Sequence, residues 1–412
     1  MVQVSIWLFI GLVLFGYVFE LILDILNISH KNKPIPPQVA DVYSDEAYAK
    51  QQKYEKVTTQ FSIFQGVIST SIIVMLLVFG VFGWLHGTIA ELGFGKTPAT
   101  LLFFGVILLV SKVFSLPFSI YGTFVIEERF GFNRITPKLF IIDSLKSLLL
   151  SVVIGGVILF VITWLFYSTG KWFWVLALAV ALVFTFIANI LYSRVIVPLF
   201  NKQEPLKEGS LRDLIFEFAQ KVNFPLTKVF VIDGSKRSTK ANAYFSGFGK
   251  NRRVVLYDTL IEKMSETEVL AVLAHEIGHF RKKHIWINLV IGNVQAGAYL
   301  FLFTLLSTKI DVASALGFAG STEAIFHLSL IGFGILTTPL DLLLSLATNR
   351  LSRKMEYQAD VFAKQYKLDS ELISGLKKLS AENLSNLTPH PAYVFVHYSH
   401  PTLVQRIGKL SD

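Results

Sequence analysis

The sequence predicts an all-α membrane protein with about seven spanning helices and a small α+β domain inserted among them. Of its 412 residues, 53% are hydrophobic and 16% are charged, whereas a soluble domain carries about 25% charged residues. Apolar runs recur along the whole chain, and only the stretch 201–284 between two of them mixes helix and strand patterns.

The apolar runs approach the ~20 residues that a helix needs to cross a bilayer. They cover residues 4–26, 61–85, 99–121, 139–166, 172–200, 285–305 and 324–347. No Lys or Arg precedes the first run, and no small-residue cleavage site follows it. We therefore expect an uncleaved first span rather than a signal peptide.

Basic residues in the connecting loops predict the orientation of the chain. The loops after the first and third runs are rich in Lys and Arg, namely Lys31, Lys33, Lys50, Lys53, Lys56, Arg129, Arg134 and Lys138. The alternate loops hold only Lys96, Lys171 and Lys309. By the positive-inside rule we expect residues 201–284 and the tail after residue 347 on the cytoplasmic side.

Charged residues also lie within the apolar runs, at Glu20, Asp24, Lys112, Asp143, Lys146 and Asp341. Each would be costly against lipid but is tolerated when it faces a hydrated interior. Glu20, Asp24 and Lys146 lie near the ends of their runs, so they can instead extend to the membrane surface. Together the charges predict a hydrated space between the helices.

Composition also limits the classes of partner. The sequence has no cysteine, which excludes a disulfide framework and cysteine-bound zinc. The formal net charge of +9 fits basic loops beside anionic lipid headgroups. No nucleic-acid-binding pattern accompanies this charge, so we expect a lipid bilayer and no nucleic acid as partner.

The insert 201–284 has the patterns of a small folded domain. Apolar spacing predicts a helix over 209–222, and β-branched and aromatic residues predict strands at 229–232 and 253–257. Residues 241–249 are expected to form a strand followed by a glycine turn. Ser265 and Glu268 form a capping-box pattern that starts a further helix, which could continue through His284 directly into the sixth apolar run.

This last helix carries a metal-binding pattern, His275-Glu276-Ile277-Gly278-His279. Two histidines four residues apart project from one helical face and can bind one metal ion. Glu276 can take a proton from water at that metal. The pattern also occurs by chance in helices, so further ligands are needed to support it.

A second helical segment, residues 349–360, supplies them. Glu356 offers the third ligand of a catalytic zinc, and Asp360, one turn later, can accept the outer N–H of a ligating histidine. The alternative is a solvated helix face on which Glu356 and Asp360 pair with Arg353 and Lys354. We expect the first arrangement, with one Zn²⁺ per chain and Arg353 close to the site.

Several of these segments together resemble the type I CAAX prenyl protease family. They are residues 124–132, 238–244, 271–279, 349–360, 387–393 and 400–406. The resemblance implies seven spans around a water-filled chamber, with zinc on the cytoplasmic side. It assigns His275, His279 and Glu356 as metal ligands and Glu276 as general base, and it places His400 near the zinc.

From this placement we expect His400 either to stabilise the oxyanion of the reaction or to be a structural histidine before Pro401. Arg406 is expected either to orient Glu356 or Asp360 or to cap the last helix. Residues Asn242, Ala243 and Tyr244 form either an edge strand that binds an extended peptide or an ordinary structural strand. The remaining histidines, His284, His390 and His397, are expected to be structural.

The expected activity is hydrolysis of peptide bonds near the C-terminus of a substrate that is either prenylated on a C-terminal cysteine or unprenylated. The alternatives are a broad quality-control metalloprotease and a non-enzymatic transporter. The length of the chain suggests a bacterial-type member in the inner membrane; a eukaryotic one would lie in the endoplasmic reticulum. We expect four segments: spans one to five (1–200), the metalloprotease insert (201–284), spans six and seven (285–347), and a cytoplasmic C-terminal segment (348–412).

Overall fold

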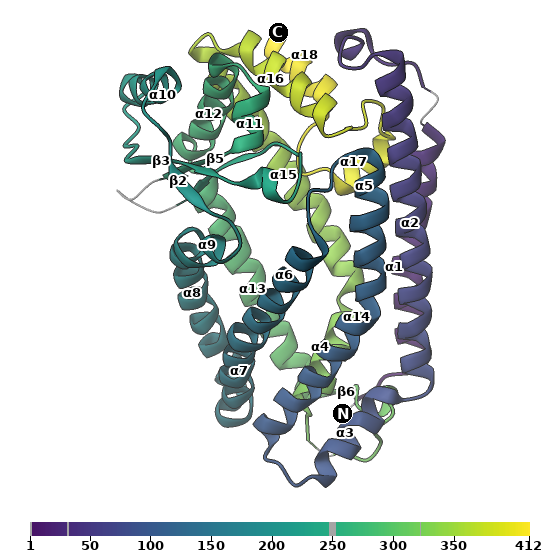
Figure 1. Ribbon diagram of the computed structural model, residues 1–412. Helices are drawn as coiled ribbons and strands as arrows, with labels where there is room; N and C mark the ends of the chain where they lie inside the picture. Colours follow the sequence, from purple (N-terminus) through teal and green to yellow (C-terminus); the bar gives the residue numbers. More distant parts are fainter. Residues whose placement is uncertain (1, 31–32, 247–252, 322) are drawn as a thin grey trace.

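Long apolar helices make up most of the molecule (Figure 1). The computed structural model describes residues 2–30, 33–246, 253–321 and 323–412. Within this part, five helical stretches are long and apolar enough to cross a membrane, and a bent pair of helices adds a sixth. One of the five, Pro137–Phe200, is 64 residues long and folds back near Gly170 (φ +52°) into two packed arms. Counting the arms separately gives the seven spans that the sequence predicts.

The spans in chain order are α1 (Ile6–Ser29); α2 (Asp45–Val78); α4 (Lys96–Tyr121) with η3 (Gly122–Glu127) and α5 (Glu128–Phe130); α6 (Pro137–Leu150) with η4 (Ser151–Gly155) and α7 (Gly156–Thr169); α8 (Phe173–Leu191) with η6 (Tyr192–Ile196) and α9 (Val197–Phe200); α13 (His284–Lys309); and α14 (Phe326–Leu336) with α15 (Thr338–Gln365). At the end far from the main sheet lie α3 (Val81–Glu91), η8 (Ser314–Leu316) and the parallel pair β1 (Val2–Gln3) and β6 (Ile310–Asp311). Two short helices, η2 (Pro37–Val39) and η5 (Gly170–Trp172), lie in connecting loops.

The seventh span differs from the straight helix over 324–347 that the sequence predicts. It is bent by 58° between α14 and α15, and α15 runs on to Gln365. Pro339 lies in the first turn of α15. Because proline lacks an N–H and clashes with the carbonyl four residues before it, it favours a kink or a break at this point.

The insert is an α/β unit built on a four-stranded sheet of order β2-β3-β5-β4. Its elements are β2 (Gln203–Pro205), α10 (Ser210–Lys221), β3 (Lys228–Ile232), η7 (Gly234–Lys236), β4 (Ala243–Ser246), β5 (Arg253–Tyr257), α11 (Asp258–Lys263) and α12 (Glu266–Arg281). β3 and β5 are parallel, while β2 and β4 run antiparallel to them at the two edges. The predicted helix and strands are confirmed; the predicted glycine turn lies outside the described residues.

The expected continuous helix from the insert into the sixth span is wrong. α12 ends at Arg281, and α13 begins at His284. Between them Lys283 has φ +58°, a left-handed conformation that a right-handed helix cannot contain. The chain therefore changes direction just after the metal-binding pattern.

The remaining helices come from the C-terminal end of the chain. They are α16 (Asp369–Glu382), α17 (Pro391–His397) and α18 (Leu403–Ser411). Leu372 of α16 and Leu410 of α18 join Ile215, Leu260 and Leu273 of the α/β unit in one buried core, whereas α17 packs against α1 and α15. α12 lies between the sheet and the pair α15 and α16 (Figure 1), so its metal-binding face is held on rigid elements.

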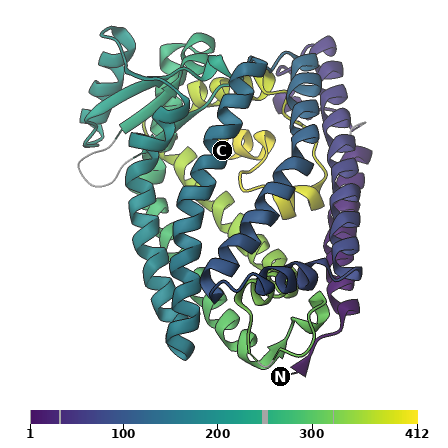
Figure 2. The same ribbon diagram turned by 60° about the horizontal axis from the view of Figure 1, so that its bottom comes forward.

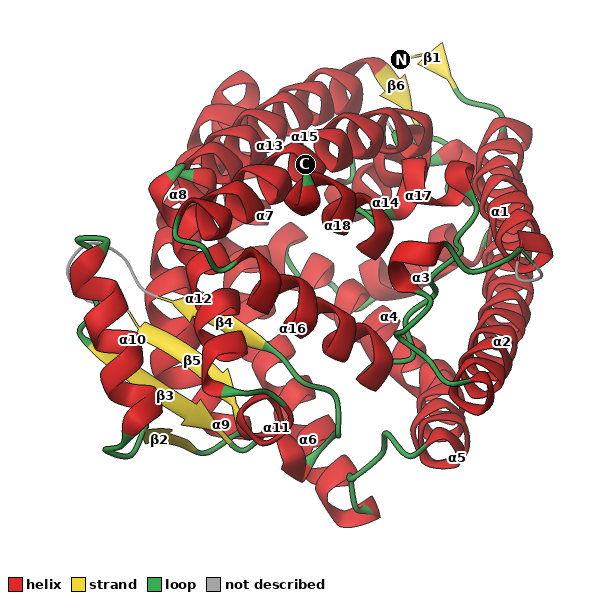
Figure 3. Cartoon of the chain, turned by 90° about the horizontal axis from the view of Figure 1, so that it is seen from above, coloured by secondary structure: helices red, strands yellow, loops and turns green. Residues whose placement is uncertain are grey.

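The membrane helices are arranged as a ring of ribbons (Figures 2 and 3). Within each of the five stretches, only 6% to 17% of the residues of the apolar window are buried. On α4, Lys112, Ser115 and Ser119 are exposed and share one helical face. A polar stripe on so apolar a helix supports the predicted hydrated interior.

Most of the charges within the spans have partners. Asp143 binds the guanidinium of Arg237 with contacts of 2.9 and 3.1 Å, and the ammonium of Lys146 donates to the Leu199 carbonyl at 2.6 Å. Two others are Glu20, which lies 3.1 Å from His397 Nε2, and Asp341, which accepts from the Tyr299 hydroxyl.

Candidate metal centre

The metal-binding helix α12 starts as the sequence predicts. The Ser265 hydroxyl accepts from the Glu268 amide, and the Glu268 carboxylate accepts from the Ser265 amide at 2.8 Å. The same carboxylate binds Ser374 and Lys378 of α16 at 2.6 and 2.7 Å. Burial alone would raise the pKa of Glu268, but these hydrogen bonds outweigh it and lower the pKa to about 2. Glu268 thus fixes the start of α12 against α16.

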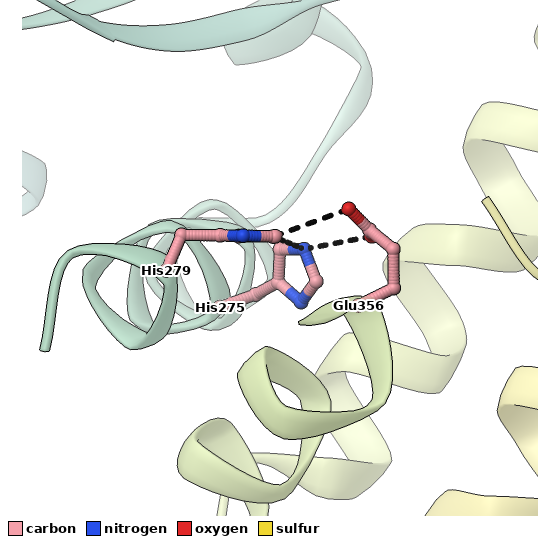
Figure 4. A group of neighbouring side chains, drawn as sticks. All are labelled: His275, His279 and Glu356. Atoms are coloured by element: carbon pink, nitrogen blue, oxygen red, sulfur yellow. Dashed lines mark hydrogen bonds and ion pairs between the residues drawn. The ribbon is translucent and has the colours of Figure 1, made fainter. Parts of the chain in front are cut away.

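His275 and His279 face Glu356 of α15 (Figure 4). The two Nε2 atoms are 3.1 Å apart, and the Glu356 carboxylate oxygens lie 3.4 Å from His275 Nε2 and 3.3 Å from His279 Nε2. Tetrahedral zinc with ligand distances of about 2.0–2.2 Å holds neighbouring ligand atoms about 3.3–3.5 Å apart. The donor set and its spacing therefore fit a zinc ion.

Gly278 allows the two ligand-bearing helices to approach each other. A Cβ at this position would lie 2.9 Å from the Ala359 Cα and 3.0 Å from the Ala359 carbonyl oxygen. Since both atoms belong to the backbone of α15, no rotamer change could make room. The sequence pattern gave no sign of this role, because it depends on where α15 crosses α12.

The outer nitrogen of His275 lies against a buried ion pair. His275 Nδ1 is 2.8 Å from Asp360 Oδ1, and Arg406 binds both Asp360 oxygens, at 2.9 and 2.5 Å. Burial would lower the pKa of Arg406, but its hydrogen bonds to Asp360 outweigh this effect and raise it. Arg406 thus stays charged, and an Asp360 carboxylate fixed in this way can accept the Nδ1–H of His275, leaving Nε2 free for a metal.

Glu276 lies beside the histidines without a partner among the described residues. Its side chain is half-buried, and no described residue forms a hydrogen bond or ion pair with its carboxylate. A carboxylate in this position can accept a proton from water at the metal.

His400 reaches the same centre from the loop between α17 and α18. Its Nδ1 lies 3.0 Å from Glu356 Oε2, and its side chain is 65% exposed. Arg353 holds this loop by donating to the carbonyls of Val394, Phe395 and Tyr398 at 3.3, 3.4 and 2.5 Å. Arg353 therefore positions the segment that carries His400 and does not pair with Glu356 or Asp360.

The other predicted histidines fall in different places. His390 caps α17 by accepting from the Ala392 amide, and His397 contacts Glu20. His284 is 2% exposed and faces His279, with 3.0 Å between their Nδ1 atoms.

The segment with Asn242, Ala243 and Tyr244 lies at an edge of the described sheet. Ala243 and Tyr244 begin β4, which pairs with β5 on one side only within the described sheet. The Asn242 carbonyl accepts from the Tyr257 amide at 3.1 Å. The preceding loop is fixed to membrane helices, because Arg237 binds Asp143 of α6 and Lys240 binds Glu127 of η3.

Comparisons with known proteins cover the whole chain. Residues 24–202 match the family description "CAAX prenyl protease N-terminal, five membrane helices", and residues 205–412 match "Peptidase family M48". The chain is 35% identical over 407 residues to the Arabidopsis thaliana CAAX prenyl protease 1 homolog, covering 97% of this chain and 95% of the relative. With the Saccharomyces cerevisiae CAAX prenyl protease 1 it shares 36% identity over 404 residues, covering 91% and 88%.

A solved structure has the same fold. The crystal structure of S. mikatae Ste24p matches with a TM-score of 0.92 and 33% sequence identity over 98% of each chain. The predicted fold class, the family resemblance and the enzyme class are thus confirmed. The chain belongs to Peptidase family M48 and is a membrane metalloendopeptidase of the CAAX prenyl protease type.

Proposed function

We propose that the metal is zinc, one ion per chain, held by His275, His279 and Glu356. The observation that carries this proposal is the convergence of these three side chains: the two Nε2 atoms are 3.1 Å apart, Glu356 Oε2 lies 3.4 Å from His275 Nε2, and Glu356 Oε1 lies 3.3 Å from His279 Nε2. Three protein ligands leave one position open, as in catalytic and not structural zinc sites. When bound, zinc would lower the pKa of a coordinated water to about 7 and polarise the scissile carbonyl.

Glu276 is the proposed general base. It accepts a proton from the attacking water and returns it to the amide nitrogen that leaves when the C–N bond breaks. Its position between the two histidine ligands in the sequence, on the half-buried side of α12, supports this assignment.

His400 is the proposed donor to the tetrahedral oxyanion. In its protonated form it donates Nδ1–H to Glu356, which lies 3.0 Å away, and still has Nε2–H for the substrate oxygen. Arg353 and Arg406 act as positioning residues, the first through the loop of His400 and the second through Asp360.

The substrate is proposed to bind as an added strand along Asn242, Ala243 and Tyr244. β4 offers the free edge that such pairing needs. An extended peptide on this edge would be held mainly by its backbone, so this strand alone permits many side-chain sequences.

We further propose that a prenylated C-terminal cysteine marks the substrate, as the names of the relatives indicate for those proteins. We also propose that the catalytic centre lies on the cytoplasmic side of the membrane, an orientation that the basic loops support. We likewise propose that the protein is a bacterial-type member of the family, and that its four segments divide at residues 200, 284 and 347.

The test is cleavage by the full-length protein in detergent, with bound zinc measured in parallel. A farnesylated peptide and its unprenylated twin are compared for wild type, Glu276→Gln and, as a matched control, Glu266→Gln on the exposed face of the same helix. We expect about one zinc per chain, and loss of cleavage in Glu276→Gln only. An absence of bound zinc, or full activity of Glu276→Gln, would refute the mechanism; equal cleavage of both peptides would refute only the prenyl preference.

A further inference from the structure

A chain of two hydrogen bonds lies behind the metal-binding face of His279. His279 Nδ1 faces His284 Nδ1 at 3.0 Å, and His284 Nε2 faces Gln358 Oε1 at 2.8 Å. His284 is 2% exposed and Gln358 is half-buried. The proposed reaction uses neither residue.

The direction of these hydrogen bonds follows from the chemistry of the donors. The Gln358 oxygen can only accept, so the proton of neutral His284 resides on Nε2 and its Nδ1 is an acceptor. That acceptor takes the Nδ1–H of His279, which leaves His279 Nε2 with a free lone pair. His279 Nε2 is the atom that faces Glu356 and His275.

We propose that His284 and Gln358 are positioning residues that hold His279 in the tautomer and ring orientation that bind the metal. This inference rests on the proposed zinc site. His275 is held in the corresponding way by Asp360, 2.8 Å from its Nδ1. His275 thus receives its outer partner from α15, which also provides the third ligand, while His279 receives its partner from α13, and Gln358 of α15 contacts that partner.

The backbone between α12 and α13 makes this contact possible. Residues five apart on a continuous helix point about 140° away from each other, so His284 could not face His279 if α12 ran on unbroken. The left-handed Lys283 (φ +58°) turns the chain between them. This conformation is strained for a non-glycine residue, and such a conformation persists where the surrounding contacts require it.

The test measures zinc affinity of the full-length protein in detergent by competition with a chelator. His284→Phe fills similar space but offers no acceptor, and we expect it to weaken zinc binding about 10–100-fold. His284→Asn places an amide oxygen near the former Nδ1 and should recover much of the loss. Gln358→Leu should weaken binding less than His284→Phe, while Gln358→Glu keeps an acceptor and should stay close to wild type.

Gln365→Leu is the control, because Gln365 is exposed near the end of the same helix and should leave zinc binding unchanged. Two results would overturn the proposal. One is a zinc affinity of His284→Phe within twofold of wild type, and the other is a loss of zinc affinity in Gln358→Glu equal to that in Gln358→Leu. If His284→Phe fails to fold, the two Gln358 variants decide. Absence of zinc from the wild-type protein would instead refute the metal site itself, so the two failures are distinguishable.

Discussion

Gly278→Ala should separate the two helices that form the metal centre. The added Cβ would lie 2.9 Å from the Ala359 Cα and from the Phe362 Cβ, and 3.0 Å from the Ala359 oxygen. Carbon atoms pack best at about 3.5–4.0 Å, so α12 and α15 would have to move apart by roughly 0.5–1 Å. A metal site tolerates displacements of only about 0.2 Å in its ligand distances.

The expected cost follows from this mismatch. Overpacking of this kind typically costs about 1–3 kcal/mol, which corresponds to a loss of roughly 5- to 150-fold in an equilibrium constant. Because the displaced element carries Glu356, we expect this loss to appear in zinc affinity, with overall helix content unchanged.

Chelator competition on the purified protein measures this affinity, and thermal unfolding of the metal-free protein measures stability. Gly292→Ala is the control: Gly292 lies in α13, and nothing lies within 4 Å of a Cβ placed there, so the change should be neutral or slightly stabilising. Wild-type zinc affinity and stability in Gly278→Ala would show that the close crossing of α12 and α15 does not set the ligand geometry.

Four further predictions concern the same centre. Removal of metal by a chelator should abolish peptide cleavage, and added zinc should restore it; activity that survives chelation would contradict metal catalysis. Asp360→Asn should weaken zinc binding about 10–100-fold by competition titration, and an unchanged affinity would show that the Asp360 charge has no part in holding His275. The pKa of Glu268 is lowered to about 2 from its ordinary 4.5, so its stabilisation is complete above pH 4.5 and is lost as the pH falls toward 2. The difference in unfolding free energy between wild type and Glu268→Gln should therefore shrink over that range, and a constant difference would argue against this assignment. Arg237→Met breaks an ion pair with Asp143 in which the side chains are only 18% and 19% exposed, so the loss should exceed the roughly 0–1 kcal/mol of an exposed pair. The variant should raise KM more than it lowers kcat, and the reverse pattern would exclude a role in placing the edge strand.

Much of the candidate site can be predicted from sequence because it depends on local helical geometry. The four-residue spacing of His275 and His279, and the capping box that begins at Ser265, are properties of one helix. The third ligand was predictable by chemistry, since a catalytic zinc needs one more carboxylate or histidine. Glu356 and Asp360, one turn apart, supply both that ligand and a partner for a histidine.

The positioning contacts could not be predicted in this way. His284 faces His279 only because Lys283 adopts a left-handed conformation, and the sequence pattern favoured an unbroken helix there. The contribution of Gly278 depends on the crossing of α12 with α15, which no periodicity reveals. The bend at Pro339 could not be predicted either, because a proline near a helix start can either begin the helix or break a longer one.

The metal centre is assembled jointly by the insert and the last two spans. α12 of the insert provides two ligands, while α15, which continues the seventh span, provides Glu356; α13, the sixth span, begins with His284 against His279. Asp341 near the start of α15 binds Tyr299 of α13, and Glu356 lies about 22 Å further along the same rigid helix. The α/β unit by itself therefore lacks a complete ligand set. A change in the spacing of α13 and α15 within the membrane would move Glu356 and His284 relative to His279, and so would change the positions of the metal ligands.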